Sequence, residues 1–102
     1  IDKAGKQLII YTITGNHLYN IDISDMTNPR GVHILPADDS VLVSDYETGE
    51  VRKYKLQAAK HHQCVWRCKG LTHPRGITSD QTGLIYAVSY NQKKIYQISP
   101  QG

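Results

Sequence analysis

Residues Pro29–Tyr54 read P-R-G-V-H-I-L-P-A-D-D-S-V-L-V-S-D-Y-E-T-G-E-V-R-K-Y, and this pattern decides the fold because it returns later in the chain. The second copy, Pro74–Ile98, reads P-R-G-I-T-S-D-Q-T-G-L-I-Y-A-V-S-Y-N-Q-K-K-I-Y-Q-I. The two Pro-Arg-Gly triplets match at an offset of 45 residues, and the later apolar runs match at 44. A period of this length, filled with short strand-like runs, indicates a repeat architecture.

A third, partial copy lies upstream of the first Pro-Arg-Gly. The run Leu8-Ile9-Ile10 matches Val41-Leu42-Val43 at an offset of 33 residues, and Leu18–Ile21 matches Val51–Tyr54 at the same offset. Because this offset is shorter than 45, we expect a first unit that lacks part of its sequence before Pro29.

Strand and turn signals alternate along the whole chain. Short runs of β-branched and aromatic residues, separated by turn residues, predict an all-β protein. The expected strands are Gln7–Thr12, His17–Ile23, Gly31–Leu35, Ser40–Ser44, Glu50–Leu56, Gln63–Lys69, Gly76–Ser79, Leu84–Val88 and Lys94–Ser99. Three consecutive apolar residues at 41–43 predict a strand buried on both faces. An alternative is a helix over Glu50–His62, which the β-branched and aromatic residues of the matching segment Lys94–Ser99 disfavour.

Length and charge set broad limits on the protein. The chain has 102 residues, which suits one domain, and begins with Ile, so we expect a piece of a longer protein. No apolar run approaches the roughly 20 residues of a membrane span, and we expect no membrane contact. The net charge of +3 is compatible with an anionic partner, although ordinary surface solubility is the favoured explanation.

The repeat resembles the NHL repeat. The resemblance rests on P-R-G-[VI], a turn with Asp or Gly, a strand such as V-L-V-S-D or I-Y-A-V-S, and a closing V-R-K-Y or I-Y-Q-I. It implies a partial β-propeller built of four-stranded antiparallel blades. The repeat offset of 44 to 45 residues is typical of propeller blades. The expected divisions are a partial blade at 7–28, a blade at 29–73 and an incomplete blade at 74–102. YWTD receptor repeats and lactonase-like propellers share much of this motif.

The resemblance also implies a function. NHL propellers often end the tripartite-motif ubiquitin ligases, where they serve as platforms that bind protein or RNA. We therefore expect a non-enzymatic binding platform in the cytoplasm, without a cofactor, whose partner is a protein or single-stranded RNA. So few blades cannot close a ring, so further blades or further copies of the chain, a homo-oligomer, are expected to complete it. The third unit departs from the pattern, because Ser89 replaces the acidic residue seen at Asp45.

Binding is expected on one rim, where loops of adjacent blades meet. Loops on a rigid scaffold commonly carry binding, and Arg with Tyr suits phosphate, carboxylate and stacking contacts. The expected partner-binding residues are Arg30, Tyr46, Arg75, Tyr90, Lys93 and His17. In the alternative interpretation, Arg30 and Arg75 pair with Asp45 or neighbouring acids and only hold the loops.

Metal and catalytic signals are weak. His61, His62, Cys64 and Cys68 are residue types that bind zinc, but their spacing is not that of a known pair of ligand pairs. We expect both cysteines to point the same way from one strand as buried thiols beside Trp66. No catalytic residue is assigned, since no G-x-S-x-G or phosphate-binding glycine loop occurs. The alternatives are a fragment of a metal-dependent lactonase-like propeller, hinted at by Asp45 and Asn91, and an extracellular YWTD-like receptor module.

Overall fold

The protein is an assembly of short antiparallel strands. A computed structural model describes residues 7–11, 14–35, 37, 39–56, 64–90 and 92–102. The strands are β1 (Gln7–Tyr11), β2 (His17–Asp22), β3 (Pro29–Leu35), β4 (Ser40–Asp45), β5 (Glu50–Lys55), β6 (Cys64–Cys68), β7 (Pro74–Ser79), β8 (Ile85–Ser89) and β9 (Ile95–Ile98). Every expected strand is confirmed, with small shifts at the ends. Strand β5 occupies the start of the alternative helix, whose later part (57–62) lies outside the described residues.

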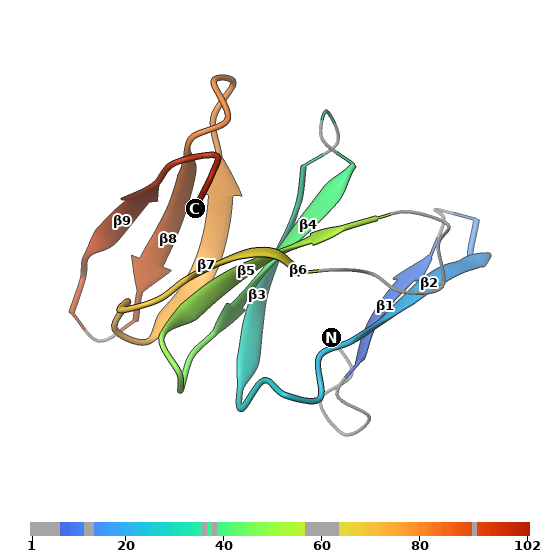
Figure 1. Ribbon diagram of the computed structural model, residues 1–102, viewed down its shortest axis with the longest axis horizontal. Coiled ribbons are helices and arrows are strands. Elements are labelled where there is room, and N and C mark those ends of the chain that lie inside the picture. The colour runs from blue at the N-terminus through green and yellow to red at the C-terminus, as the bar shows by residue number, and fades with distance from the viewer. Residues whose placement is uncertain (1–6, 12–13, 36, 38, 57–63, 91) are drawn as a thin grey trace.

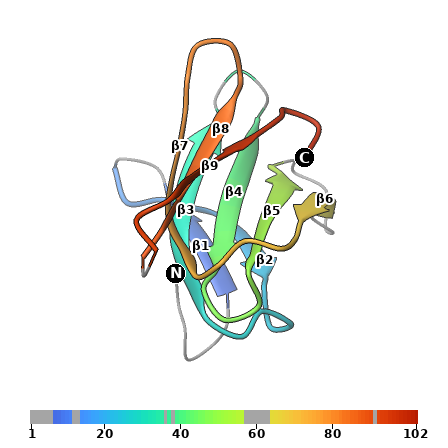
Figure 2. The same ribbon diagram turned by 90° about the vertical axis from the view of Figure 1, so that its left-hand side faces the viewer.

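The strands form three separate sheets that stand side by side (Figure 1). The first sheet pairs β1 with β2, the second has the order β3-β4-β5-β6, and the third has the order β7-β8-β9. Figure 2 looks at the third sheet with the second behind it. Among the described residues, no helix has the length and apolar character that a membrane span requires. The all-β expectation is therefore confirmed at the level of three small antiparallel sheets.

Two apolar interfaces hold the sheets together, and β4 contributes to both. Val41 and Val43 pack in the cluster between the first and second sheets. Leu42 packs in the cluster between the second and third sheets. All three side chains are fully buried. Successive residues of a strand point to opposite faces, so an uninterrupted apolar run is what a sheet covered on both sides requires, as the sequence predicted.

The first sheet corresponds to the last two strands of a repeat unit, which corrects the alignment expected from the sequence. Strands β1 and β2 lead into β3 as β5 and β6 lead into β7. Met26 and Leu71, 45 residues apart, are both buried and occupy the same position before the two Pro-Arg-Gly triplets. The offset is thus 45 here too. The match at 33 was wrong because short Leu and Ile runs do not reveal which strand of a unit they form.

The second and third sheets approach each other closely at Gly31. The N–H of Gly31 donates to Ser44 Oγ (2.8 Å), and that hydroxyl donates to the carbonyl oxygen of Arg75 (2.8 Å). A Cβ atom at Gly31 would collide with the same carbonyl oxygen. Further along these strands, His33 Nε2 and Ser79 Oγ are hydrogen-bonded at 2.8 Å. Glycine is therefore required at Gly31 by space between two backbones.

We expect Gly31→Ala to destabilise the protein by about 2 kcal/mol or more, because the added methyl group meets rigid backbone instead of a movable side chain. The free energy of unfolding from urea titration measures this. Gly76→Ala is the matched control at the equivalent repeat position, where a methyl group would meet no atom within 4 Å, and it should change little. Equal losses in the two variants would contradict the assigned close approach.

Candidate functional site

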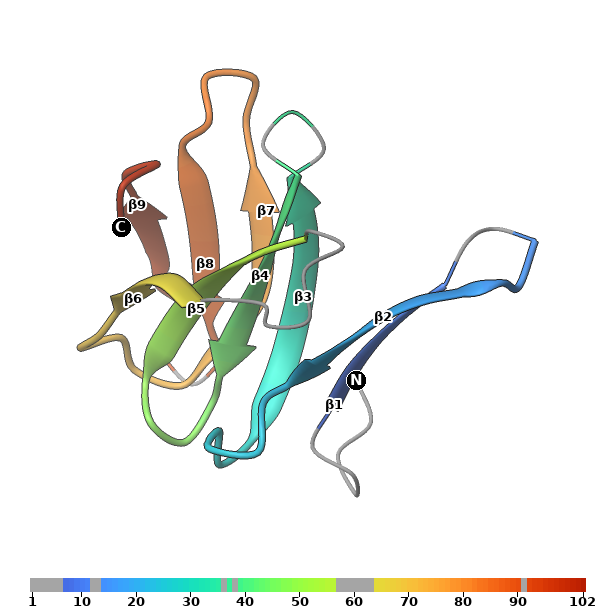
Figure 3. The same cartoon turned by 45° about the vertical axis from the view of Figure 1, so that its right-hand side comes forward.

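Four chain segments meet at one end of the second and third sheets (Figure 3). They are the starts of β3 and β7, the β4–β5 turn and the β8–β9 connection. Five side chains from these segments are linked by ring contacts, and we call them the rim: Arg30, Tyr46, His73, Arg75 and Tyr90. Four of the five are residues that the sequence predicted to bind a partner.

Each sheet contributes one arginine stacked on one tyrosine. The guanidinium carbon of Arg30 lies 5.1 Å from the ring centroid of Tyr46. The guanidinium carbon of Arg75 lies 4.7 Å from the ring centroid of Tyr90. Both separations are within the range of cation–π attraction. A guanidinium positioned over a ring still presents N–H donors at its edge, in the fork that matches carboxylate and phosphate oxygens.

Aromatic contacts join the two arginine–tyrosine pairs into one strip. The ring centroids of Tyr46 and Tyr90 are 6.2 Å apart, and those of Tyr46 and His73 are 4.7 Å apart. Backbone bonds set the positions of both tyrosines in the same way. The N–H of Tyr46 donates to the carbonyl of Asn28 (2.9 Å), and the N–H of Tyr90 donates to that of His73 (3.1 Å). The repeat therefore places two equivalent side-chain pairs next to each other.

Asp45 fixes the backbone behind Arg30 and Tyr46. Its buried carboxylate accepts from the N–H groups of Thr27 (2.8 Å) and Asn28 (2.9 Å) before β3 and from that of Glu47 (3.2 Å) after β4. Burial opposes ionisation, but the hydrogen bonds outweigh it and hold the pKa of Asp45 below its ordinary value. Among the described contacts, this carboxylate serves the backbone and pairs with neither rim arginine. The alternative pairing with Asp45 is wrong.

The third sheet holds its equivalent connection differently. Ser89 occupies the position of Asp45, and its buried hydroxyl oxygen has no hydrogen-bond partner among the described residues. The N–H of Thr72, which matches Thr27, donates instead to the hydroxyl of Tyr96 (3.3 Å). Hydrogen bonding with Thr72 lowers the pKa of Tyr96. The connection that leads to the rim is therefore held by the carboxylate of Asp45 in the second sheet and by the neutral hydroxyl of Tyr96 in the third.

An ion network around the buried Arg52, which the sequence did not reveal, supports the β2–β3 connection. Arg52 lies almost fully buried on β5, where its Nε donates to Glu50 (2.8 Å) and its guanidinium bonds Asp25 (2.9 Å). Burial disfavours its charge, but bonds to Tyr54, Glu50 and Asp25 reverse this effect and raise the pKa of Arg52. Asp25 belongs to the β2–β3 connection, so the network ties that segment to β5. The signal in the sequence for this network was the pair of opposite charges two residues apart on one strand, Glu50 and Arg52.

His17 and Lys93 do not join the five rim residues. His17 lies at the β1–β2 turn, which Figures 1 and 3 place at the other end of the molecule, and it contacts Tyr11 and Asn20. The expected place of His17 at the rim was wrong because it depended on the offset of 33, and partner binding by His17 stays a prediction. Lys93 is exposed in the β8–β9 connection with a φ of 52°. It therefore lies at the rim end of the third sheet, outside the ring contacts that join the stacked pairs.

The cysteines face different interfaces. Cys64 packs against the cluster between the first and second sheets, and Cys68 packs against the cluster between the second and third. A register shift opposite Lys53 and Tyr54 skips one residue of β6, so the expectation that both thiols point the same way was wrong. In the described part of the chain, no three of the residue types His, Cys, Asp and Glu are grouped as metal ligands. His61, His62 and Asn91 lie outside that part.

One solved structure relates this geometry to known proteins. The chain is similar to a putative 6-phosphogluconolactonase from Bacteroides uniformis ATCC 8492, with a TM-score of 0.52 and 10% sequence identity. The similarity covers 93% of this chain and 39% of that chain, so this chain spans well under half the length of that protein. No protein-family model and no curated protein matches the chain. At this identity the likeness shows the fold alone, and membership of the NHL family stays a resemblance.

This comparison overturns the expectation that the chain has no enzymatic activity. The similar structure reported above is that of a putative 6-phosphogluconolactonase, which is an enzyme. The sequence argument relied on missing motifs, namely a nucleophile elbow and a phosphate-binding glycine loop. Such motifs describe only the chemistries that use them, so their absence could not support the conclusion, and we do not keep it.

We expect Asp45→Asn to lower the free energy of unfolding by about 3 kcal/mol, because an amide nitrogen would face N–H groups that now donate to a buried carboxylate. Urea titration at neutral pH measures the loss. Ser89→Ala is the matched control at the equivalent position, and it should be neutral or slightly stabilising because it removes a hydroxyl that has no partner among the described residues.

The pH dependence gives a second readout of the same change. Since folding lowers the pKa of Asp45, its contribution is fully present above the ordinary aspartate pKa of about 3.9 and is lost as the pH falls further. Asp45→Asn should therefore lose less stability than the wild-type protein below that pH. A wild-type loss that Asp45→Asn leaves unchanged would show that other carboxylates set acid stability.

Proposed function

We propose that the chain is a segment of a β-propeller whose rim binds single-stranded RNA. The observation that carries the proposal is the pair of Arg–Tyr stacks, Arg30 on Tyr46 and Arg75 on Tyr90, joined by the contact between the two tyrosines. Two cations held at adjacent repeats, with aromatic rings between them, suit a ligand that carries negative charge and flat rings at regular intervals.

The propeller part of the proposal is supported by an uncovered face of the third sheet. Val51 on β5 is fully buried against the third sheet, whereas Ile95, its repeat equivalent on β9, is 69% exposed. Val88 on the same face is 44% exposed. A propeller requires a further sheet there. A second copy of the chain could supply this sheet and so complete the ring as a homo-oligomer. This stays a prediction, and the molar mass from light scattering tests it.

The rim favours RNA over an acidic peptide for a chemical reason. An acidic peptide would use the N–H donors of the two arginines, which also suit phosphate. RNA would use these donors and would in addition stack bases on exposed rings, and the Tyr90 side chain is 58% exposed. The net charge of +3 suits either anionic partner, so the exposed ring is the feature that distinguishes RNA.

We expect the double variant Arg30→Gln/Arg75→Gln to bind a short fluorescein-labelled oligouridine about tenfold more weakly, as measured by fluorescence anisotropy. The slope of log K against log salt should also become shallower by about 0.7 for each phosphate that the variant no longer neutralises. Lys55→Gln/Arg67→Gln is the matched control, because it removes two positive charges from β5 and β6 outside the rim and should bind nearly as the wild type does.

Two results would contradict the RNA proposal. One is equal weakening in both double variants, which would mean that net charge alone drives the binding. The other is a labelled polyglutamate peptide that binds more tightly than the oligouridine and does not respond to Tyr90→Ala, which would assign the rim to acidic proteins.

A second candidate function comes from the comparison alone. The structural neighbour is named for action on 6-phosphogluconolactone, a phosphorylated substrate whose charge the rim arginines could also bind. We expect that, if this chain acts on such a lactone, hydrolysis will exceed the uncatalysed rate and will fall in Arg30→Gln/Arg75→Gln. Acid release followed at constant pH measures it, and a rate equal to the buffer blank would remove this candidate.

A further inference from the structure

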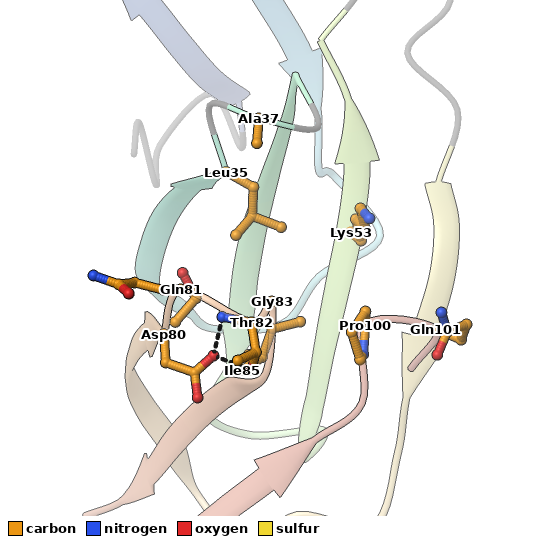
Figure 4. Close-up of a pocket in the computed structure, with 11 residues that line it drawn as sticks. Leu35, Ala37, Lys53, Asp80, Gln81, Thr82, Gly83, Ile85, Pro100 and Gln101 are labelled. Atoms are coloured by element: carbon orange, nitrogen blue, oxygen red, sulfur yellow. Dashed lines mark hydrogen bonds between the residues drawn. The ribbon is translucent and has the colours of Figure 1, made fainter.

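A pocket of about 650 Å³ opens between the second and third sheets, at the end away from the rim (Figure 4). Its size is within the range of small-molecule sites. Figure 4 shows Leu35 and Lys53 on its upper side and the turn Asp80–Gly83 with Pro100 and Gln101 below. Leu35, Ile85 and Pro100 give it apolar walls, and Lys53 is its cationic lining residue.

Lys53 carries a charge, whereas its equivalents in the first and third sheets, Leu8 and Gln97, are neutral. Its equivalent in the first sheet is Leu8, which is 3% exposed and packs in the apolar interface. Lys53 itself is only 8% exposed. The repeat therefore fills this position with an aliphatic side chain in one unit and with a cation in the next. Lys53 therefore brings a positive charge into the pocket wall, where little water competes for it.

The acidic residue in the pocket wall is engaged by its own turn. The carboxylate of Asp80 accepts from the N–H (2.9 Å) and hydroxyl (2.6 Å) of Thr82, from the N–H of Leu84 (3.1 Å) and from the hydroxyl of Tyr86 (3.0 Å). Its pKa is lowered chiefly by Thr82. Lys53 also interacts with the protein, so its side chain is held in position. The other polar residues among the described lining are neutral.

We propose that this pocket binds a small organic anion, a carboxylate or phosphate ester, with Lys53 as its counter-ion and with Leu35, Ile85 and Pro100 against its carbon skeleton. The site is separate from the rim and does not depend on RNA binding. It lies between two sheets that are both present in the chain, so it is complete without a further sheet.

The protein carries its own reporter for this pocket. Trp66 is the one tryptophan of the sequence, and its Nε1–H donates to the carbonyl of Pro100 (3.1 Å), a residue of the pocket wall. A ligand that shifts Pro100 changes the surroundings of the indole. Tryptophan fluorescence therefore follows binding without a label.

We expect glucose 6-phosphate and citrate to change the fluorescence of Trp66 in a saturable manner at constant ionic strength, while glucose does not. In Lys53→Leu the apparent affinity for both anions should fall about tenfold or more, since a buried counter-charge is removed. This variant should fold, because leucine is the residue found at the equivalent Leu8. Lys55→Leu, two residues along β5, is the matched control and should retain binding.

Thermal unfolding provides an independent measurement. The anions should raise the Tm of the wild type and of Arg30→Gln/Arg75→Gln, but not that of Lys53→Leu, since a ligand stabilises only the state that binds it. Asp80→Asn should bind the anions at least as well as the wild type. Equal responses in Lys53→Leu and the wild type, or equal responses to glucose and glucose 6-phosphate, would overturn the proposal.

Discussion

The buried carboxylate of Asp45 is the interaction on which the candidate site depends. It holds N–H groups from the connection before β3 and from the turn after β4, so two segments nearly twenty residues apart share one anchor. Arg30 follows the first segment, and Tyr46 begins the second. The stack between them is therefore set by backbone bonds to a charge in the interior. A weak cation–π contact at the surface can persist because the parts that form it are already in place.

Apolar contacts between the sheets also follow the repeat. The second sheet turns alternate residues of β4 towards its two neighbours, as Val41 and Leu42 show. Some positions depart from this pattern. Lys53 is such a departure, as is Ser89, whose hydroxyl has no partner among the described residues. One departure borders a pocket and the other lies next to the rim, so deviations from the repeat coincide with the two surfaces of interest.

Much of the strand structure could be predicted from the sequence. The repeat period, the turn residues and the apolar run at 41–43 are all signals that can be read from residues close together in the chain. The meeting of Arg30 and Arg75 with two tyrosines could be predicted because the repeat brings equivalent loops together. The errors had other causes. Placing His17 required knowing which strand of a unit a short apolar run represents. The directions of Cys64 and Cys68 depend on a bulge that leaves no signal in residue type, and the pocket depends on the spacing of two sheets.

The offset between the repeats falls from 45 to 44 residues within the turn that joins the first two strands of a sheet, since Leu35–Ser40 is one residue longer than the equivalent Asp80–Leu84. This turn borders the pocket, whereas the connections at the rim keep their length. Length can therefore change at one end of the molecule without moving Asp45, Arg30 or Tyr46. The fold separates an edge that is free to diversify from an edge whose spacing is locked, so each could acquire a ligand of its own without disturbing the other.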